Sequence, residues 1–146
     1  MKKLRQSLFI ITLLLLGSVT MSQAQSTKKM LTRGWSFSFE GIMANLPEDK
    51  KAEMDKLPDE QKEMMKAMME KSYIIFKSGG KMEVSMNGKQ ENMTWTLSDD
   101  GTVVTTTEEN GKVTEIKIIK LTKDQLILAE IGASKDTRLV FKPKKD

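Results

Sequence analysis

Short stretches of alternating apolar and polar residues, separated by turn-forming residues, fill most of the chain and constrain its fold most strongly. Successive side chains of a strand point to opposite faces, so this period of two predicts strands with one buried face. Pairs such as Asn87-Gly88 and Asn110-Gly111 favour tight hairpin turns between them. We expect eight strands, at 35–39, 73–77, 81–86, 92–97, 102–108, 113–121, 125–131 and 137–142. Eight short, evenly spaced strands predict a mainly β protein, an antiparallel barrel or sandwich.

The strand expected at 113–121 changes phase along its length. Ile116 and Ile118 share one face, whereas Ile119 and Leu121 lie on the other. A bulge inserts one extra residue into a strand and shifts its alternation. The sequence therefore predicts a β-bulge or a strongly coiled strand near Ile118 and Ile119.

A helical pattern interrupts the strands between the first and the second. Leu46-Pro47 and Leu57-Pro58 open two similar segments eleven residues apart, each with two carboxylates directly after the proline. Proline and acidic residues favour the first turn of a helix. We therefore expect a two-helix insert at about 46–71, with helices near 47–56 and 58–71. A methionine-rich stripe on the second helix should pack on the barrel wall or across its mouth.

The first 24 residues have the pattern of a secretory signal peptide. Basic residues at 2, 3 and 5 precede an apolar run at 8–16, and small residues stand at Ser22 and Ala24. These features predict cleavage after Ala24, a barrel domain at 25–146 and export to the periplasm or the extracellular space. The run is short for a membrane-spanning helix, and we expect no stable membrane span in the mature chain. An uncleaved N-terminal membrane anchor is the alternative.

Composition limits the chemistry. The chain has neither His nor Cys, which excludes Ser-His-Asp and Cys-His nucleophile systems and zinc sites built from these ligands. Adjacent acidic pairs occur at 99–100 and 108–109, but neighbouring residues of a strand face opposite ways. We therefore predict no catalytic residue, no enzyme activity and no cofactor. Loss of the leader removes three of the 24 Lys and Arg residues and nearly balances the 20 acidic residues, so we expect no nucleic-acid partner.

A run from Trp95-Thr-Leu-Ser-Asp-Asp-Gly101 through residues 113–131 resembles the small exported lipocalin-like domain proteins of Bacteroidota. The order of leader, Leu31-x-x-x-Trp35 strand and C-terminal hairpins is similar to that family as well. This resemblance implies an eight-stranded antiparallel up-and-down barrel. It also implies that Trp35 and an arginine of the last strand, Arg138, close the base of the barrel.

A barrel of eight strands is large enough to hold one small ligand. Flexible methionine side chains would suit an apolar ligand such as a fatty acid or another lipid. A solid core filled by the same side chains is the alternative. The residues predicted to bind the ligand are Phe37, Phe39, Met64, Met68, Met82, Met86, Met93 and Trp95.

Two further functions remain open at the level of sequence. Met64, Met65, Met68 and Met69 follow helical spacing, and their thioethers could converge on a soft ion such as Cu(I) or Ag(I). The helical insert could instead bind a protein through an uncovered apolar patch. The oligomeric state is not indicated by any feature of the sequence.

Overall fold

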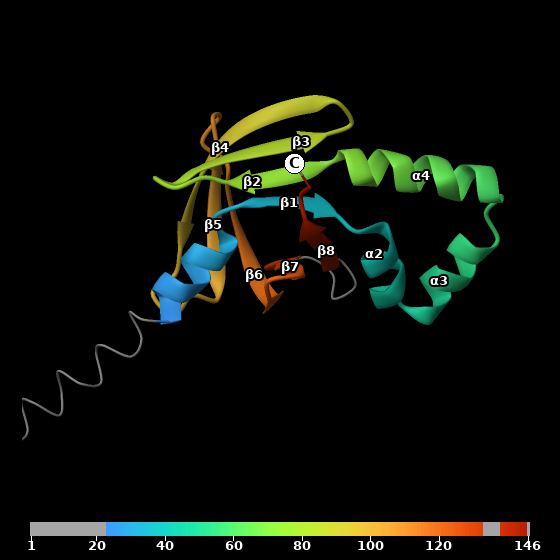
Figure 1. The fold of residues 1–146 in the computed structure, drawn as a ribbon, viewed down its shortest axis with the longest axis horizontal. Helices are drawn as coiled ribbons and strands as arrows, with labels where there is room; N and C mark the ends of the chain where they lie inside the picture. Colours follow the sequence, from blue (N-terminus) through green and yellow to red (C-terminus); the bar gives the residue numbers. More distant parts are fainter. Residues whose placement is uncertain (1–22, 133–137, 146) are drawn as a thin grey trace, which may run out of the picture.

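The computed structural model describes residues 23–132 and 138–145, and these form a closed antiparallel barrel with its strands in chain order (Figure 1). This confirms the predicted eight-stranded up-and-down barrel with helices between its first two strands. Most of the predicted signal peptide lies outside the described residues. The strands are β1 (Gly34–Phe37), β2 (Tyr73–Phe76), β3 (Lys81–Met86), β4 (Lys89–Leu97), β5 (Val103–Glu108), β6 (Val113–Leu121), β7 (Leu126–Glu130) and β8 (Arg138–Pro143).

The barrel closes where β1 pairs with β8. Trp35 lies opposite Pro143 in this pairing, and Phe37 lies opposite Phe141. The two phenylalanine rings pack inside the barrel with their centroids 4.4 Å apart. Cross-strand aromatic pairs stabilise a sheet beyond their buried area, so this contact strengthens the seam.

Aromatic side chains and a helix at residues 23–31 close one end of the barrel, which we call the base. Leu31 and Trp35 are fully buried, and the Trp35 indole N–H donates a hydrogen bond to the Leu31 carbonyl at 3.1 Å. Lys28 places its ammonium 5.8 Å from the ring centre of Trp95. The sequence did not predict this helix, which is drawn in blue in Figure 1. In the described ranges, no helix has the length and apolar character needed to cross a membrane.

The expectation that Arg138 closes the base over Trp35 is wrong. Trp35 lies opposite Pro143, five positions further along β8 than Arg138. At about 3.3 Å per strand residue, Arg138 lies roughly 16 Å away, toward the other end of the barrel. The guanidinium over the Trp35 ring belongs instead to Arg33, at 5.2 Å from the ring centre.

The helical insert has one helix more than predicted. The helices α3 (Glu48–Asp55) and α4 (Asp59–Lys71) confirm the two expected segments, and α2 (Phe39–Asn45) precedes them. Here Ser38 ends the first strand as an N-cap, because its hydroxyl accepts a hydrogen bond from the Gly41 N–H at 3.1 Å. Phe39 therefore begins a helix and does not continue the strand face of Phe37. The α3 and α4 helices extend away from the barrel (Figure 1).

The predicted bulge is confirmed. The register between β6 and β7 shifts between Ile118 and Lys120. Ile116 and Ile118 before the shift and Leu121 after it therefore all pack against the core.

Gly41 is where α2 approaches β8 most closely. A Cβ atom at this position would overlap the Cγ1 atom of Val140, whose carbonyl accepts a hydrogen bond from the Ser38 N–H at 2.8 Å. The contact requires glycine for reasons of space, although glycine is a poor helix former.

We expect Gly41→Ala to lower the free energy of unfolding by about 1–3 kcal/mol, as overpacking does. In an uncrowded helix the same substitution stabilises by up to about 1 kcal/mol, so the sign of the effect is diagnostic. Urea unfolding of Gly41→Ala, Val140→Ala and the double variant measures it. Val140→Ala should relieve part of the loss, and a stabilising Gly41→Ala would contradict the close contact.

Candidate ligand-binding pocket at the barrel mouth

The end of the barrel opposite the base, which we call the mouth, holds an apolar pocket of about 480 Å³. It lies between the helical insert and the ends of three strands, because β1 ends here, β3 turns into β4 and β8 begins. Its lining residues are Phe37, Ile42, Leu46, Met65, Met68, Met69, Ser72, Met86, Asn87, Arg138 and Leu139.

The wall of the mouth pocket is almost entirely aliphatic, aromatic or thioether. Met68, Met86 and Leu139 are 48%, 49% and 38% exposed, so they leave an apolar rim open to solvent. Folding does not bury these side chains, although each is large and apolar. An exposed apolar rim around a concave pocket is a usual feature of a ligand site.

Polar groups at the mouth pocket are few. The Ser72 hydroxyl donates to the Met68 carbonyl at 3.1 Å and is occupied by the helix end. Arg138 is exposed and has no ion pair with any residue in the described ranges. Among the residues that line the mouth pocket, Arg138 is the only one with a cationic side chain. Asn87, at the tip of the hairpin between β3 and β4, adds a side-chain amide.

Residues 43–128 match the family model described as "Lipocalin-like domain", which covers more than half of the chain. The chain belongs to this lipocalin-like domain family. A lipocalin-like barrel is, at the level of the family, an architecture for binding a small molecule. No curated protein and no solved structure matches the chain.

Three of the predicted ligand-binding residues meet at the mouth of this lipocalin-like barrel. Phe37, Met68 and Met86 come from β1, α4 and the end of β3. Strand and helix periodicity were enough to find them, since each lies on an apolar face. Ile42, Leu46 and Leu139 were missed, because their place at the mouth depends on α2 and on the β1–β8 register.

The other predicted binding residues lie elsewhere. Met64 is 62% exposed on α4, and Phe39 lines a cavity inside the helical insert. Trp95 is core: its ring packs edge-on against Phe76 at 5.1 Å, and its N–H donates to the Lys77 and Lys81 carbonyls. These positions do not support a single site shared by all eight residues.

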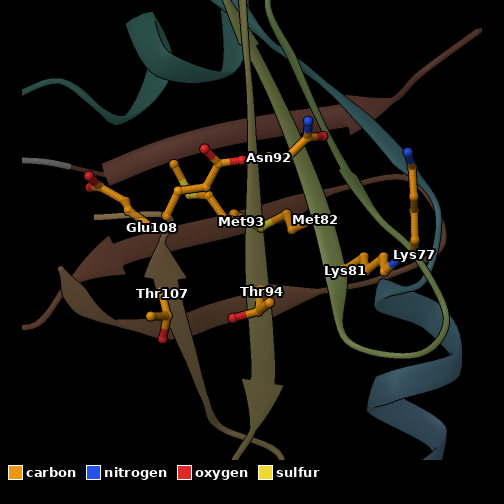
Figure 2. A pocket seen from close by; sticks show the side chains of 9 residues that line it. Lys77, Lys81, Met82, Asn92, Met93, Thr94, Thr107 and Glu108 are labelled. Carbon is orange, nitrogen blue, oxygen red and sulfur yellow. The ribbon is translucent and has the colours of Figure 1, made fainter. Parts of the chain in front are cut away.

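Met82 and Met93 form a separate group on neighbouring strands. They are cross-strand partners and line a pocket of about 520 Å³ along β3, β4 and β5. Figure 2 shows the two methionines between Lys77 and Lys81 on one side and Glu108 on the other. This pocket has more charge than the mouth pocket. Met82 is also 95% buried, so most of its side chain packs in the core.

One ion pair joins the helical insert to the barrel, and a second joins two helices of the insert. Lys142 of β8 contacts Glu70 of α4 at 2.8 Å, and Lys66 of α4 contacts Glu40 of α2 at 2.9 Å. The hydrogen bond from Lys66 lowers the pKa of the Glu40 carboxyl below its usual value of 4.5. The same bond raises the pKa of Lys66 above 10.5. The charged forms of both groups therefore favour the contact between α2 and α4.

Because the folded pKa of Glu40 is lowered, its contribution to stability is complete above about pH 4.5 and is lost as the pH falls through the lowered value. We expect Glu40→Gln to be less stable than the native chain at pH 7, with the difference shrinking as the pH falls below 4.5 through the lowered pKa of Glu40. Urea unfolding at pH 7, 5 and 3 measures this. Glu91→Gln, an exposed change on β4, is the control. A Glu40→Gln difference that persists unchanged at pH 3 would contradict the role of the charge.

Proposed function

We propose that this lipocalin-like protein is an exported, non-catalytic binder of an amphipathic small molecule of the fatty-acid or lipid class. The ligand occupies the mouth pocket, with its apolar part against the methionines and its anionic group at Arg138. The observation that carries this proposal is an apolar pocket with a single cationic side chain in its lining.

The pocket has the size and flexibility that such a ligand needs. A volume of about 480 Å³ falls within the range of about 300–1,000 Å³ that is usual for small-molecule sites. Met65, Met68, Met69 and Met86 supply four unbranched, polarizable side chains in its wall. Such side chains adapt to ligands of different shape, which supports recognition of a ligand class over recognition of one compound.

Arg138 favours an anionic headgroup. A guanidinium binds a carboxylate through two parallel hydrogen bonds, and this geometry adds specificity to charge. Arg138 is exposed at the start of β8, beside Leu139 of the apolar rim. A fatty acid bound along the pocket would bring its carboxylate to the solvent edge, where this side chain lies. Its role is thus assigned to the ligand, in place of the base closure that the sequence suggested.

The predicted leader supports export, and its removal is compatible with the base of the fold. Cleavage after Ala24 would leave residues 25–31 of the first helix, including Leu31, whose carbonyl accepts the Trp35 hydrogen bond. The resemblance to exported proteins of Bacteroidota supports the same location, periplasmic or extracellular. The absence of cysteine is compatible with an oxidising compartment.

We expect a dansyl-labelled fatty acid to bind the mature protein and a natural long-chain fatty acid to displace it. Arg138→Met should weaken fatty-acid binding about ten- to hundredfold, the equivalent of about 1.5–3 kcal/mol for a hydrogen bond to a charged group. Binding of the matching fatty alcohol should change little. Lys117→Met, an exposed change on β6, is the control for general loss of charge.

Two results would overturn the proposal. One is the absence of displaceable fatty-acid binding by the native protein. The other is an equal effect of Arg138→Met and Lys117→Met on the acid, which would make the cation a nonspecific attractant.

The export proposal has its own test. Expression of the full chain in a bacterium with a secretory pathway should give a protein whose first residue is Gln25, measured by intact mass. A chain that retains residues 1–24 and stays in the membrane fraction would favour the anchor instead.

A further inference from the structure

The helical insert forms an open cavity of about 400 Å³ beside the mouth pocket. Four methionines from three helices line it: Met43 of α2, Met54 of α3, and Met65 and Met69 of α4. The sequence places these residues as far as 26 positions apart, and the fold brings them to one cavity. The other lining residues are Phe39, Ile42, Leu46, Lys50, Glu53 and Leu57.

Packing does not fully bury the four methionines that line this cavity. No residue between 39 and 71, a segment that the structure describes in full, reaches full burial. Met69 and Ile42 pack against the barrel core, whereas Met54 belongs to α3, a helix that extends away from the barrel (Figure 1). The insert is therefore a layer of helices around a thioether-lined space, and a well-packed core of its own is missing from it.

Thioether sulfur is a soft donor that prefers soft monovalent ions such as Cu(I) and Ag(I) over Zn²⁺, Ca²⁺ or Mg²⁺. Methionine has three rotatable side-chain bonds, so sulfurs from three helices can adjust to one ion. Glu53 in the same lining supplies a carboxylate to offset part of the positive charge, and its ion-pair partner Lys50, at 3.2 Å, lines the cavity as well.

We propose that Met43, Met54, Met65 and Met69 bind one soft monovalent ion, Cu(I) or Ag(I), between the three helices. This set differs from the consecutive cluster that helical spacing suggests. Met64 is largely exposed, and Met68 lines the mouth pocket and is absent from this cavity. Binding is a ligand exchange: Cu(I) leaves a weaker donor as Cu(I), and no electron is transferred.

The cavity shares one wall with the mouth pocket. Met65 and Met69 line both spaces, whereas Met43 and Met54 line the helical cavity alone among the pockets described. Substitutions at Met43 and Met54 therefore separate metal binding from ligand binding. Leucine has a volume similar to methionine and lacks the sulfur, so it preserves packing while it removes the donor.

The test uses the mature protein and Ag(I), which is not readily oxidised or reduced, followed by Cu(I) in competition with a chromogenic chelator. We expect one ion per chain by native mass spectrometry. The double variant Met43→Leu/Met54→Leu should bind at least about tenfold more weakly. Met64→Leu is the matched control on α4 and should bind like the native protein. Zn²⁺ should not compete.

Absence of stoichiometric binding, or equal affinity of the double variant and Met64→Leu, would overturn the proposal. X-ray absorption of the Cu(I)-loaded native protein gives a second, mutation-free readout: a first shell of sulfur supports the site, and a shell of oxygen or nitrogen alone refutes it. Fatty-acid binding by the double variant is measured in parallel. If the double variant keeps fatty-acid binding but loses metal affinity, the insert is still folded. The metal site and the fatty-acid site are then tested independently of each other.

Discussion

Pairing of β1 with β8 is the constraint on which the rest of the molecule depends. β1 has only four residues, yet it pairs with β2 on one side and β8 on the other. The Phe37–Phe141 contact lies at this seam. Without the seam, β1 and β8 would become open edges with unpaired backbone groups. Because β1 is so short, the chain leaves the barrel at Ser38, and the helical insert begins directly beside the mouth.

The two ends of the barrel differ in what fills them. At the base, Trp35, Phe76 and Trp95 are nearly fully buried, and Leu31 seals the space between them and the first helix. Large aromatic side chains with satisfied N–H groups give a rigid and specific core. At the mouth, Met68, Met86 and Leu139 remain partly exposed. The molecule thus combines a fixed scaffold with an adaptable end, which is the usual arrangement of a binding barrel.

Most of the barrel could be predicted from the sequence because its strands and turns are determined by residues close together in the chain. Alternating apolar residues and turns such as Asn110-Gly111 predict strands and hairpins without knowledge of distant partners. The prolines and acidic residues at the starts of α3 and α4 are equally local, and so is the phase change in β6. The eight-strand architecture, the bulge and both helices were confirmed for this reason.

The remaining features depend on contacts between distant parts of the chain. The alternation of Trp35 and Phe37 continues formally to Phe39, but the Ser38 cap and the packing of α2 on Val140 end the strand earlier. The place of Arg138 depends on the register of β8 against β1, which sequence spacing does not determine. Likewise, methionines that share a helix face separate into two cavities once three helices pack. The mouth pocket was therefore predicted only in part, through Phe37, Met68 and Met86.

Methionine methyl groups report directly on whether the mouth is the binding site. Protein labelled with ¹³C at these methyls gives one resonance for each methionine, and the positions can be assigned by single substitutions. Addition of a long-chain fatty acid should shift the resonances of Met68 and Met86 and leave Met30 and Met82 unchanged, since Met30 lies at the base and Met82 in the core. Shifts confined to Met82 and Met93, or no shifts at saturating fatty acid, would contradict ligand binding at the mouth.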